Sequence, residues 1–239
     1  MRSCFALFLG LAVQIAASPQ PPQILQIYRE PLKPGSEVAY QEIEEDAARI
    51  SAELGCPHPY LGIESLTGPK EVWFFNGYAS PDEWVQVVLA YANNDALLKA
   101  LKKNGKRKSK LTGKHIETFA KYRPDLSRGA PWILGHGRFL VITVTKSKDS
   151  APMDGTVFEA EKGTRYIVRG FRTREEADAA AGTQGSPASG AQAGDVAPGP
   201  ESRVFAVRPF WSFPAKEWID ADPFFWFPDT PWPKPKSPT

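Results

Sequence analysis

The sequence predicts an α+β protein in which two halves of similar element order pack sheet against sheet, with the second half degenerate. Three observations lead to this prediction. Apolar runs typical of strands alternate with amphipathic helical patterns in the first half of the chain. Similar strand runs return after a connector rich in turn residues. Aromatic residues occupy both faces of a predicted hairpin, which indicates that its sheet is covered on two sides.

Residues 1–17 have the features of a cleavable signal peptide. Arg2 precedes an apolar stretch that begins at Cys4, and small residues follow as far as Ala17. The stretch is too short to cross a bilayer, which takes about 20 apolar residues. We therefore expect an exported protein, periplasmic or extracellular, that is cleaved near Ala17 and has no transmembrane segment.

The composition of the remaining chain argues against two classes of protein. The full sequence has 29 Lys and Arg against 27 Asp and Glu, a formal charge of +2, and loss of Arg2 leaves +1. A balance so close to neutral argues against a dedicated nucleic-acid binder. Cleavage also removes Cys4, so Cys56 is the remaining thiol and a disulfide-stapled scaffold is not expected. We expect Cys56 to be a small buried residue at a helix end.

Residues 23–124 contain the elements of the predicted first half. Ser36 is suited to cap a helix, and Ser80-Pro81 starts another by combining a capping box with proline at the first helical position. The element order is strand, helix, strand, strand, helix, strand, which is the plan of a ferredoxin-like domain. The predicted strands cover residues 23–30, 60–66, 71–78 and 114–122, and the helices begin at residues 37 and 81, the second with a break at Asn93-Asn94.

Residues 125–221 read as a second, degenerate ferredoxin-like half. Strands are predicted at 138–146, 156–160, 164–171 and 203–211, with one helix at 173–181; the loop 147–154 replaces the other helix. Residues 182–200 consist mostly of Gly, Ala, Ser, Pro, Gln and Thr, which predicts a flexible insertion. Residues 222–239 are rich in proline and aromatic residues, and we expect them to lie as an extended strap on the body.

Polar residues on otherwise apolar strands are the candidates for a site. We expect Tyr28, Glu64, Trp73 and Asn76 to line a pocket in the barrel formed by the two halves, with aromatic contact area and a few orienting polar atoms. Glu64 and His115 are the candidate proton acceptors if the pocket is catalytic. The three histidines have no metal-ligand spacing, so neither a metal nor another cofactor is expected.

Two further groups of residues admit two interpretations each. Cys56 and His58 are two residues apart, but the prolines between and after them favour a structural connection, with His58 at a pocket edge, over a nucleophile pair. The run from Lys99 to Lys110 holds seven basic residues and no acid. It is either a solvated helix end or a contact surface for polyanions or an anionic membrane.

The first half resembles the dimeric α/β-barrel superfamily, in which ferredoxin-like units pair sheet to sheet. The resemblance rests on the strand Ile24-Leu25-Gln26-Ile27-Tyr28, the helix from Glu37, the segment Glu71-Val72-Trp73-Phe74-Phe75-Asn76 and the helix after Ser80-Pro81. Members include antibiotic-biosynthesis-type monooxygenases and stress-response barrels, so the resemblance does not by itself fix a function.

Three functions are compatible with these features of the sequence. The first is binding of a small, partly apolar molecule in a barrel pocket. The second is a cofactor-independent monooxygenase or isomerase that uses the same pocket, and the third is a structural or envelope-associated protein. The expected partner is a small-molecule ligand rather than nucleic acid, and the chain is expected to be a monomer or a homodimer.

Overall fold

The computed structural model describes residues 20–146, 150–182 and 201–226. The predicted signal peptide at 1–17 therefore lies outside the described residues, as do almost all of the predicted insertion at 182–200 and most of the predicted tail at 222–239. In the described part of the chain, no helix is long and apolar enough to cross a membrane.

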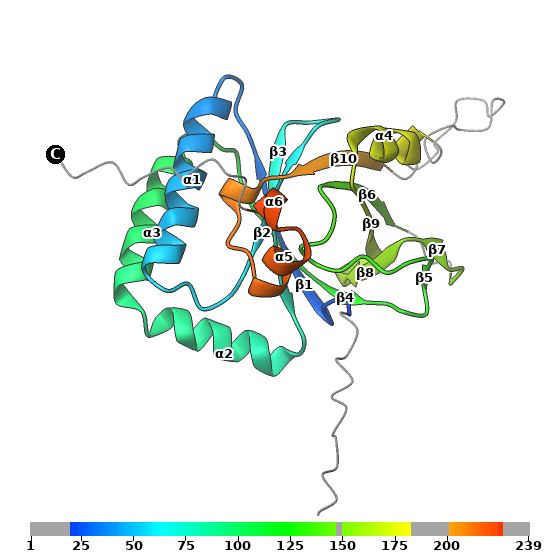
Figure 1. The fold of residues 1–239 in the computed structure, drawn as a ribbon, viewed down its shortest axis with the longest axis horizontal. Helices are drawn as coiled ribbons and strands as arrows, with labels where there is room; N and C mark the ends of the chain where they lie inside the picture. Colours follow the sequence, from blue (N-terminus) through cyan, green and yellow to red (C-terminus); the bar gives the residue numbers. More distant parts are fainter. Residues whose placement is uncertain (1–19, 147–149, 183–200, 227–239) are drawn as a thin grey trace, which may run out of the picture.

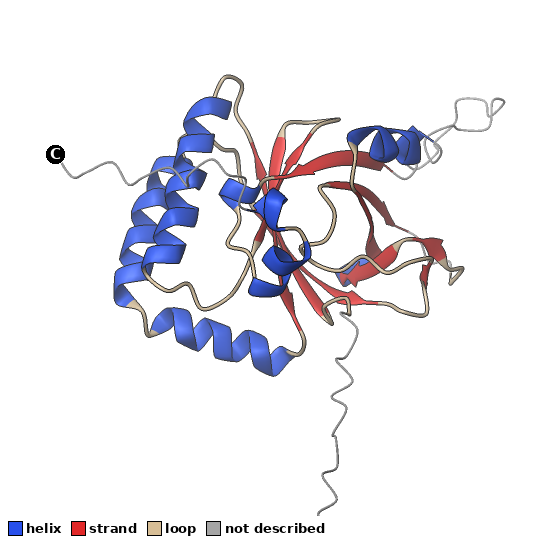
Figure 2. Ribbon diagram, viewed as in Figure 1, coloured by secondary structure: helices blue, strands red, loops and turns tan. Residues whose placement is uncertain are grey.

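Eight antiparallel strands close into a barrel, with helices outside it (Figures 1 and 2). Around the barrel the order is β1-β3-β2-β10-β6-β9-β8-β4, and β4 pairs with β1 to complete the ring. The prediction of a mixed α+β fold is confirmed. The strands are β1 (Ile24–Pro31), β2 (Leu61–Ser65), β3 (Glu71–Tyr78), β4 (Ile116–Tyr122), β6 (Phe139–Lys146), β8 (Thr156–Ala160), β9 (Thr164–Phe171) and β10 (Glu201–Val207). The short strands β5 (Ser127–Arg128) and β7 (Met153–Asp154) pair separately.

The hydrophobic core occupies the inside of the barrel. Successive side chains of a strand point to opposite faces, so alternate residues of every strand turn inward. Leu25 and Ile27 of β1, together with Trp73 and Phe75 of β3, are fully buried in one cluster to which all eight barrel strands contribute. An eight-stranded barrel is about wide enough to be filled by its own side chains, and large aromatic residues fill this one.

Six helices are present in the described residues, and most lie on two sides of the barrel (Figure 1). The group beside β1 and β3 comprises α1 (Glu37–Glu53), α2 (Pro81–Ala92) and α3 (Asp95–Lys108), whereas α4 (Arg174–Gly182) lies against β6, β9 and β10. Phe74, on the outer face of β3, packs beneath the first group with Tyr40 and Trp211. Both faces of the hairpin are therefore buried, which confirms the expectation drawn from its aromatic residues.

The starts of α2 and α3 follow the capping signals of the sequence. Ser36 precedes α1 but does not cap it through its side chain, because its hydroxyl donates to the carbonyl oxygens of Lys33 and Leu111 instead. The hydroxyl oxygen of Ser80 accepts a hydrogen bond from the backbone N–H of Glu83, and the Glu83 carboxylate accepts one from the N–H of Ala79. This is the predicted capping box at the start of α2. Asn94 caps α3 in the same way, through the N–H of Leu97, so the predicted break at Asn93-Asn94 separates two helices.

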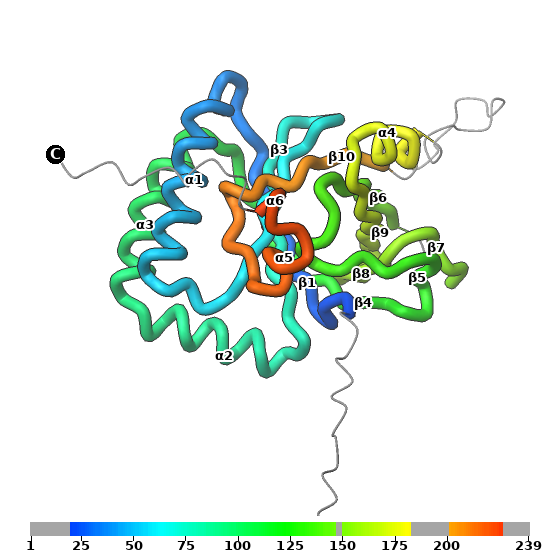
Figure 3. The backbone as a smooth tube through the Cα atoms, viewed as in Figure 1, coloured from blue at the N-terminus to red at the C-terminus, as the bar shows by residue number. Residues whose placement is uncertain are grey.

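The C-terminal part of the described chain differs from the prediction. Strand β10 ends at Val207, because Pro209 cannot continue a strand ladder and instead begins the 3-10 helix Pro209–Trp211. Two short helices follow, α5 (Lys216–Ala221) and α6 (Pro223–Trp226), where a connection and an extended strap were expected. The tube in Figure 3 shows this segment returning across the barrel. Trp218 and Trp226 join the barrel core, with ring centroids 5.7 Å apart.

A buried charge cluster joins side chains of β1, β3 and β10, with β2 between β3 and β10 in the ring. The Glu71 carboxylate accepts hydrogen bonds from Arg203 Nη1 at 2.8 Å, from Arg29 Nη2 at 3.0 Å and from Trp73 Nε1 at 2.7 Å. The guanidinium of Arg29 also stacks over the Trp73 ring, 4.5 Å from its centroid. The cluster therefore links three strands through one carboxylate.

Candidate functional site

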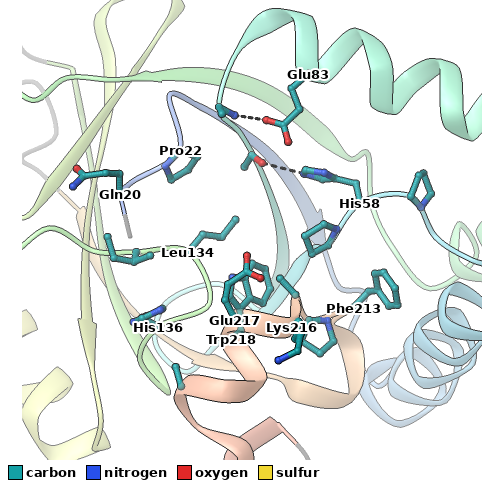
Figure 4. Close-up of a pocket in the computed structure, with 18 residues that line it drawn as sticks. Gln20, Pro22, His58, Glu83, Leu134, His136, Phe213, Lys216, Glu217 and Trp218 are labelled. Atoms are coloured by element: carbon teal, nitrogen blue, oxygen red, sulfur yellow. Dashed lines mark hydrogen bonds between the residues drawn. The ribbon is translucent and has the colours of Figure 1, made fainter. Parts of the chain in front are cut away.

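Two clefts lie on either side of the end of β3. The wider one, about 1070 Å³, lies between the segment of Gln20 and Pro22, the Pro57–Pro59 connection and α5. Figure 4 shows His58 and His136 on opposite sides of a broad opening. The narrower one, about 380 Å³, lies between the outer face of β1 and β3 and the helices α1, α2 and α3. We call it the tyrosine cleft; its lining includes Tyr28, Tyr60, Tyr78 and Tyr91.

His58 forms part of the wall between the two clefts. Its ring stacks on Tyr78 with centroids 4.7 Å apart, and its Nε2 lies 3.0 Å from the carbonyl oxygen of Gly77. Burial disfavours the charged imidazolium and lowers the pKa of His58, despite the nearby Glu83 carboxylate. The ring is therefore neutral at pH 7, and the expected position of His58 at a pocket edge is confirmed. Cys56 is buried, as expected, and its Sγ lies 2.9 Å from Tyr91 Oη.

One end of the tyrosine cleft carries a compact group of charges. Lys108 Nζ lies 3.0 Å from Oε1 of both Glu30 and Glu44, and Tyr40 Oη donates a hydrogen bond to Glu30. Burial raises the pKa of the Glu44 carboxyl even though Lys108 opposes the shift. Burial opposes the charge of Lys108, but the two carboxylates outweigh it and raise the pKa of Lys108. This end of the cleft thus holds one fixed cation between two carboxyl groups.

The walls of the cleft are neutral phenols and amides. Burial and the Glu117 carboxylate raise the pKa of Tyr28 to about 12, and burial also raises the pKa of Tyr60 and Tyr78. These hydroxyl groups therefore stay protonated at physiological pH and can donate hydrogen bonds. Tyr78 Oη donates to Gln26 Oε1 at 2.8 Å, and Gln26 Nε2 donates to Glu117 Oε1 at 2.6 Å.

The structure separates the residues expected to line one barrel pocket. Tyr28 and Asn76 line the tyrosine cleft on the outer face of the sheet, whereas Trp73 lies inside the barrel and is fully buried. The reason is the alternation of side chains, which sends Trp73 and Asn76 of the same strand to opposite faces. Glu64 lies on β2, where its carboxylate accepts hydrogen bonds from Arg208. His115 is exposed, with its ring centroid 6.3 Å from that of Tyr28.

Sequence reasoning missed the charged residues at the end of the tyrosine cleft, Lys108 and Glu44. Lys108 belongs to the basic run and looks like one more solvated lysine, although it pairs with two carboxylates. For Glu44, the sequence does contain a signal that could have identified it as buried. It falls on the same helical stripe as Tyr40, Ala47 and Ser51, at the three- and four-residue spacing of an inward face, where a carboxylate requires a partner.

No group of three or more His, Cys, Asp or Glu side chains suited to a metal occurs among the described residues. In the tyrosine cleft, Lys108 pairs with Glu30 and Glu44, and Tyr40 donates a hydrogen bond to Glu30.

Comparison with known proteins gives a likeness of fold only. No family model matches the chain, and no curated protein sequence matches it. Two solved structures are similar to it, both described as a "putative monooxygenase". The one from Fusobacterium nucleatum is 12% identical and covers 79% of this chain and 93% of its own, with a TM-score of 0.46. The one from Lactobacillus acidophilus is 10% identical and covers 79% and 94%, with a TM-score of 0.44.

Proposed function

We propose that the protein binds a small, partly apolar molecule in the tyrosine cleft. The observation that supports this most directly is the convergence of four tyrosine side chains, from separate elements, on one cleft that ends in a buried charge group. Its volume of about 380 Å³ lies in the range of small-molecule pockets. The rings offer apolar contact area, while the Asn76 amide and the hydroxyl oxygens, which keep lone pairs that can accept, offer hydrogen bonds that would orient a ligand.

The enzymatic alternative, a cofactor-independent monooxygenase or isomerase, has less support from the geometry. Glu64 is held by Arg208 and lines neither described cleft, and His115 is exposed. A general base must reach the proton it removes, and neither candidate faces the tyrosine cleft's interior. Binding therefore stands as the proposed function, with Tyr28 and Asn76 as ligand-contacting residues.

Filling the cleft tests the proposal. Ala47 lines the cleft on α1, and Ala52 lies on the same helix but is exposed. In Ala47→Trp the indole should occupy the space of the ligand, whereas Ala52→Trp should leave it open. Small molecules that co-purify with each protein from its natural host are identified by native mass spectrometry, and circular dichroism checks the fold. A folded Ala47→Trp protein that retains the same bound mass as Ala52→Trp would contradict the proposal.

We also propose that the barrel is made of two ferredoxin-like halves, residues 23–124 and 125–221. The strand order supports this: β4-β1-β3-β2 in the first half and β10-β6-β9-β8 in the second follow the same fourth-first-third-second plan. The halves would then join through the pairs β2 with β10 and β4 with β8. Separate expression of residues 23–124 tests this division, because an independent half should fold as a dimer that completes its own barrel.

Export remains a proposal that rests on residues 1–17, which lie outside the described residues. N-terminal sequencing of the protein recovered from the periplasm or the medium should begin at or near Ser18. Recovery of the intact chain from the cytoplasm alone would contradict it.

A further inference from the structure

The outward side of α2 exposes a patch of apolar residues. None of the residues of this helix is buried, and Val85, Val88 and Leu89 are 42%, 46% and 50% exposed. Only Val87 and Tyr91, on the inward side, are partly covered along with the capping residue Glu83. The apolar arc of the helix is therefore wider than the surface that it packs against.

The patch extends beyond α2 to two neighbouring elements. Trp84 meets Phe119 of β4 edge to face, with ring centroids 5.7 Å apart, and both rings are more than a third exposed. Leu98, in the first turn of α3, is also exposed. We call this surface the α2 patch: Trp84, Val85, Val88, Leu89, Leu98 and Phe119. Contiguous exposed apolar residues of this kind mark interaction surfaces.

A row of exposed lysines lies on α3, next to the α2 patch. They lie on the side opposite its buried residues, Leu97 and Asn104, and within the described chain they form no ion pair. Arg107 and Lys108 differ, because they pair with carboxylates of β1 and α1. The acids of the two helices lie in their first turns. We call these lysines the lysine row: Lys99, Lys102, Lys103 and Lys106 of α3, continued by Lys110 in the turn after the helix.

The apolar and basic surfaces adjoin each other. Only Asn93 and Asn94 separate α2 from α3, and the two helices meet at one edge of the molecule (Figure 1). Leu98 of the α2 patch and Lys99, the first residue of the lysine row, are consecutive and both exposed. The two surfaces therefore adjoin at this point.

We propose that the α2–α3 edge binds the surface of an anionic lipid bilayer. Valine, leucine and tryptophan side chains of the α2 patch would enter the region between headgroups and acyl chains, and the lysines would lie over the lipid phosphates. Charge complementarity favours this partner over a second copy of the chain, which would bring two lysine rows together. The edge is separate from the tyrosine cleft, which Tyr91 lines from the inward side of α2, so each proposal can fail without the other.

Vesicle flotation tests the proposal with the purified full chain. Vesicles of phosphatidylglycerol and phosphatidylcholine in equal parts should carry the protein upward, and added salt should weaken the partitioning. The double variant Lys102→Glu/Lys103→Glu should lower the partition coefficient at least about 25-fold. Loss of about 1 kcal/mol per basic residue near an anionic surface corresponds to about fivefold each, and the two new carboxylates add repulsion. Val88→Asp should lower it at least about tenfold.

Matched variants remove apolar and basic residues elsewhere on the surface. Val38 is 75% exposed on α1 and Lys70 is exposed in the turn before β3, so Val38→Asp and Lys70→Glu should partition like the natural protein. Any contribution of residues 1–17 is common to all these proteins and cancels in the comparison. The proposal is overturned if the natural protein does not float, or if Val88→Asp and Lys102→Glu/Lys103→Glu float as it does. It is also overturned if the natural protein is a dimer in solution that Val88→Asp dissociates, because a second copy then covers the patch.

Discussion

Glu71→Gln should destabilise the fold by about 3 kcal/mol. The Glu71 side chain is 9% exposed and that of Arg203 5%, which places the pair among buried ion pairs rather than surface ones. Breaking a buried pair costs about 3–5 kcal/mol, because the remaining charge stays buried without a partner, whereas an exposed pair is worth about 0–1 kcal/mol. Glutamine keeps an acceptor for Trp73 Nε1, so we expect the lower end of the buried range.

Urea unfolding followed by tryptophan fluorescence at pH 7 measures this difference in the free energy of unfolding. Glu53 provides the control, because it pairs with Arg49 on α1 and its side chain is 49% exposed. The same change there, Glu53→Gln, should alter the free energy of unfolding by less than about 0.5 kcal/mol.

The pH dependence gives a second readout. Burial opposes ionisation of Glu71, but hydrogen bonds from Arg203 and Trp73 and the charge of Arg29 outweigh it and lower the pKa of the carboxyl in the folded state. The ionised carboxylate therefore contributes its full stabilisation above the unfolded-state pKa of about 4.3, and that contribution is lost as the pH falls toward the folded-state value. The difference between the natural protein and Glu71→Gln should shrink below about pH 4. A difference under about 1 kcal/mol at pH 7, or one that stays constant into acid, would refute this account.

Three further predictions concern single positions. Gly135 has a φ of +84°, and an added Cβ would lie 2.1 Å from Cδ2 of Trp218. Gly135→Ala should therefore lower the free energy of unfolding by about 2–3 kcal/mol in the same urea titration. Gly105 of α3 faces open space, so Gly105→Ala should raise it by up to about 1 kcal/mol; a loss of stability would contradict this. Burial lowers the pKa of His58, so NMR titration of its ring protons should give a value below about 6.5, and protonation of this ring should destabilise the fold as the pH drops.

The sequence was sufficient to predict the helices and strands whose apolar periodicity agrees with the turn and capping residues at their ends. The strands at 156–160 and 164–171 were predicted at their observed bounds, and the first helix begins at Glu37 as predicted. In each case a clear apolar period is bounded by turn or capping residues, so local preference and burial favour the same structure. The short helices α5 and α6 were missed because four to six residues are too few to establish a helical period.

The site was predicted only in part, for a physical reason. Alternation along a strand assigns residues to faces, but it does not say which face carries an open cleft and which is filled. Tyr28 and Asn76 fall on the face with the cleft, whereas Trp73 falls on the face filled by other aromatic side chains. The pairing of Lys108 with Glu30 and Glu44 joins α3 to β1 and α1, and contacts between such distant segments depend on tertiary packing.

The position of β10 means that the barrel can close only late in synthesis. This strand lies between β2 and β6, yet it is the last strand among the described residues. Until residue 207 has left the ribosome, β2 and β6 each present an edge with unpaired backbone groups, which is the kind of surface that recruits strands from other chains. Completion of the barrel removes both edges at once. A nascent chain halted before β10 should therefore depend on chaperones, whereas the finished molecule should not.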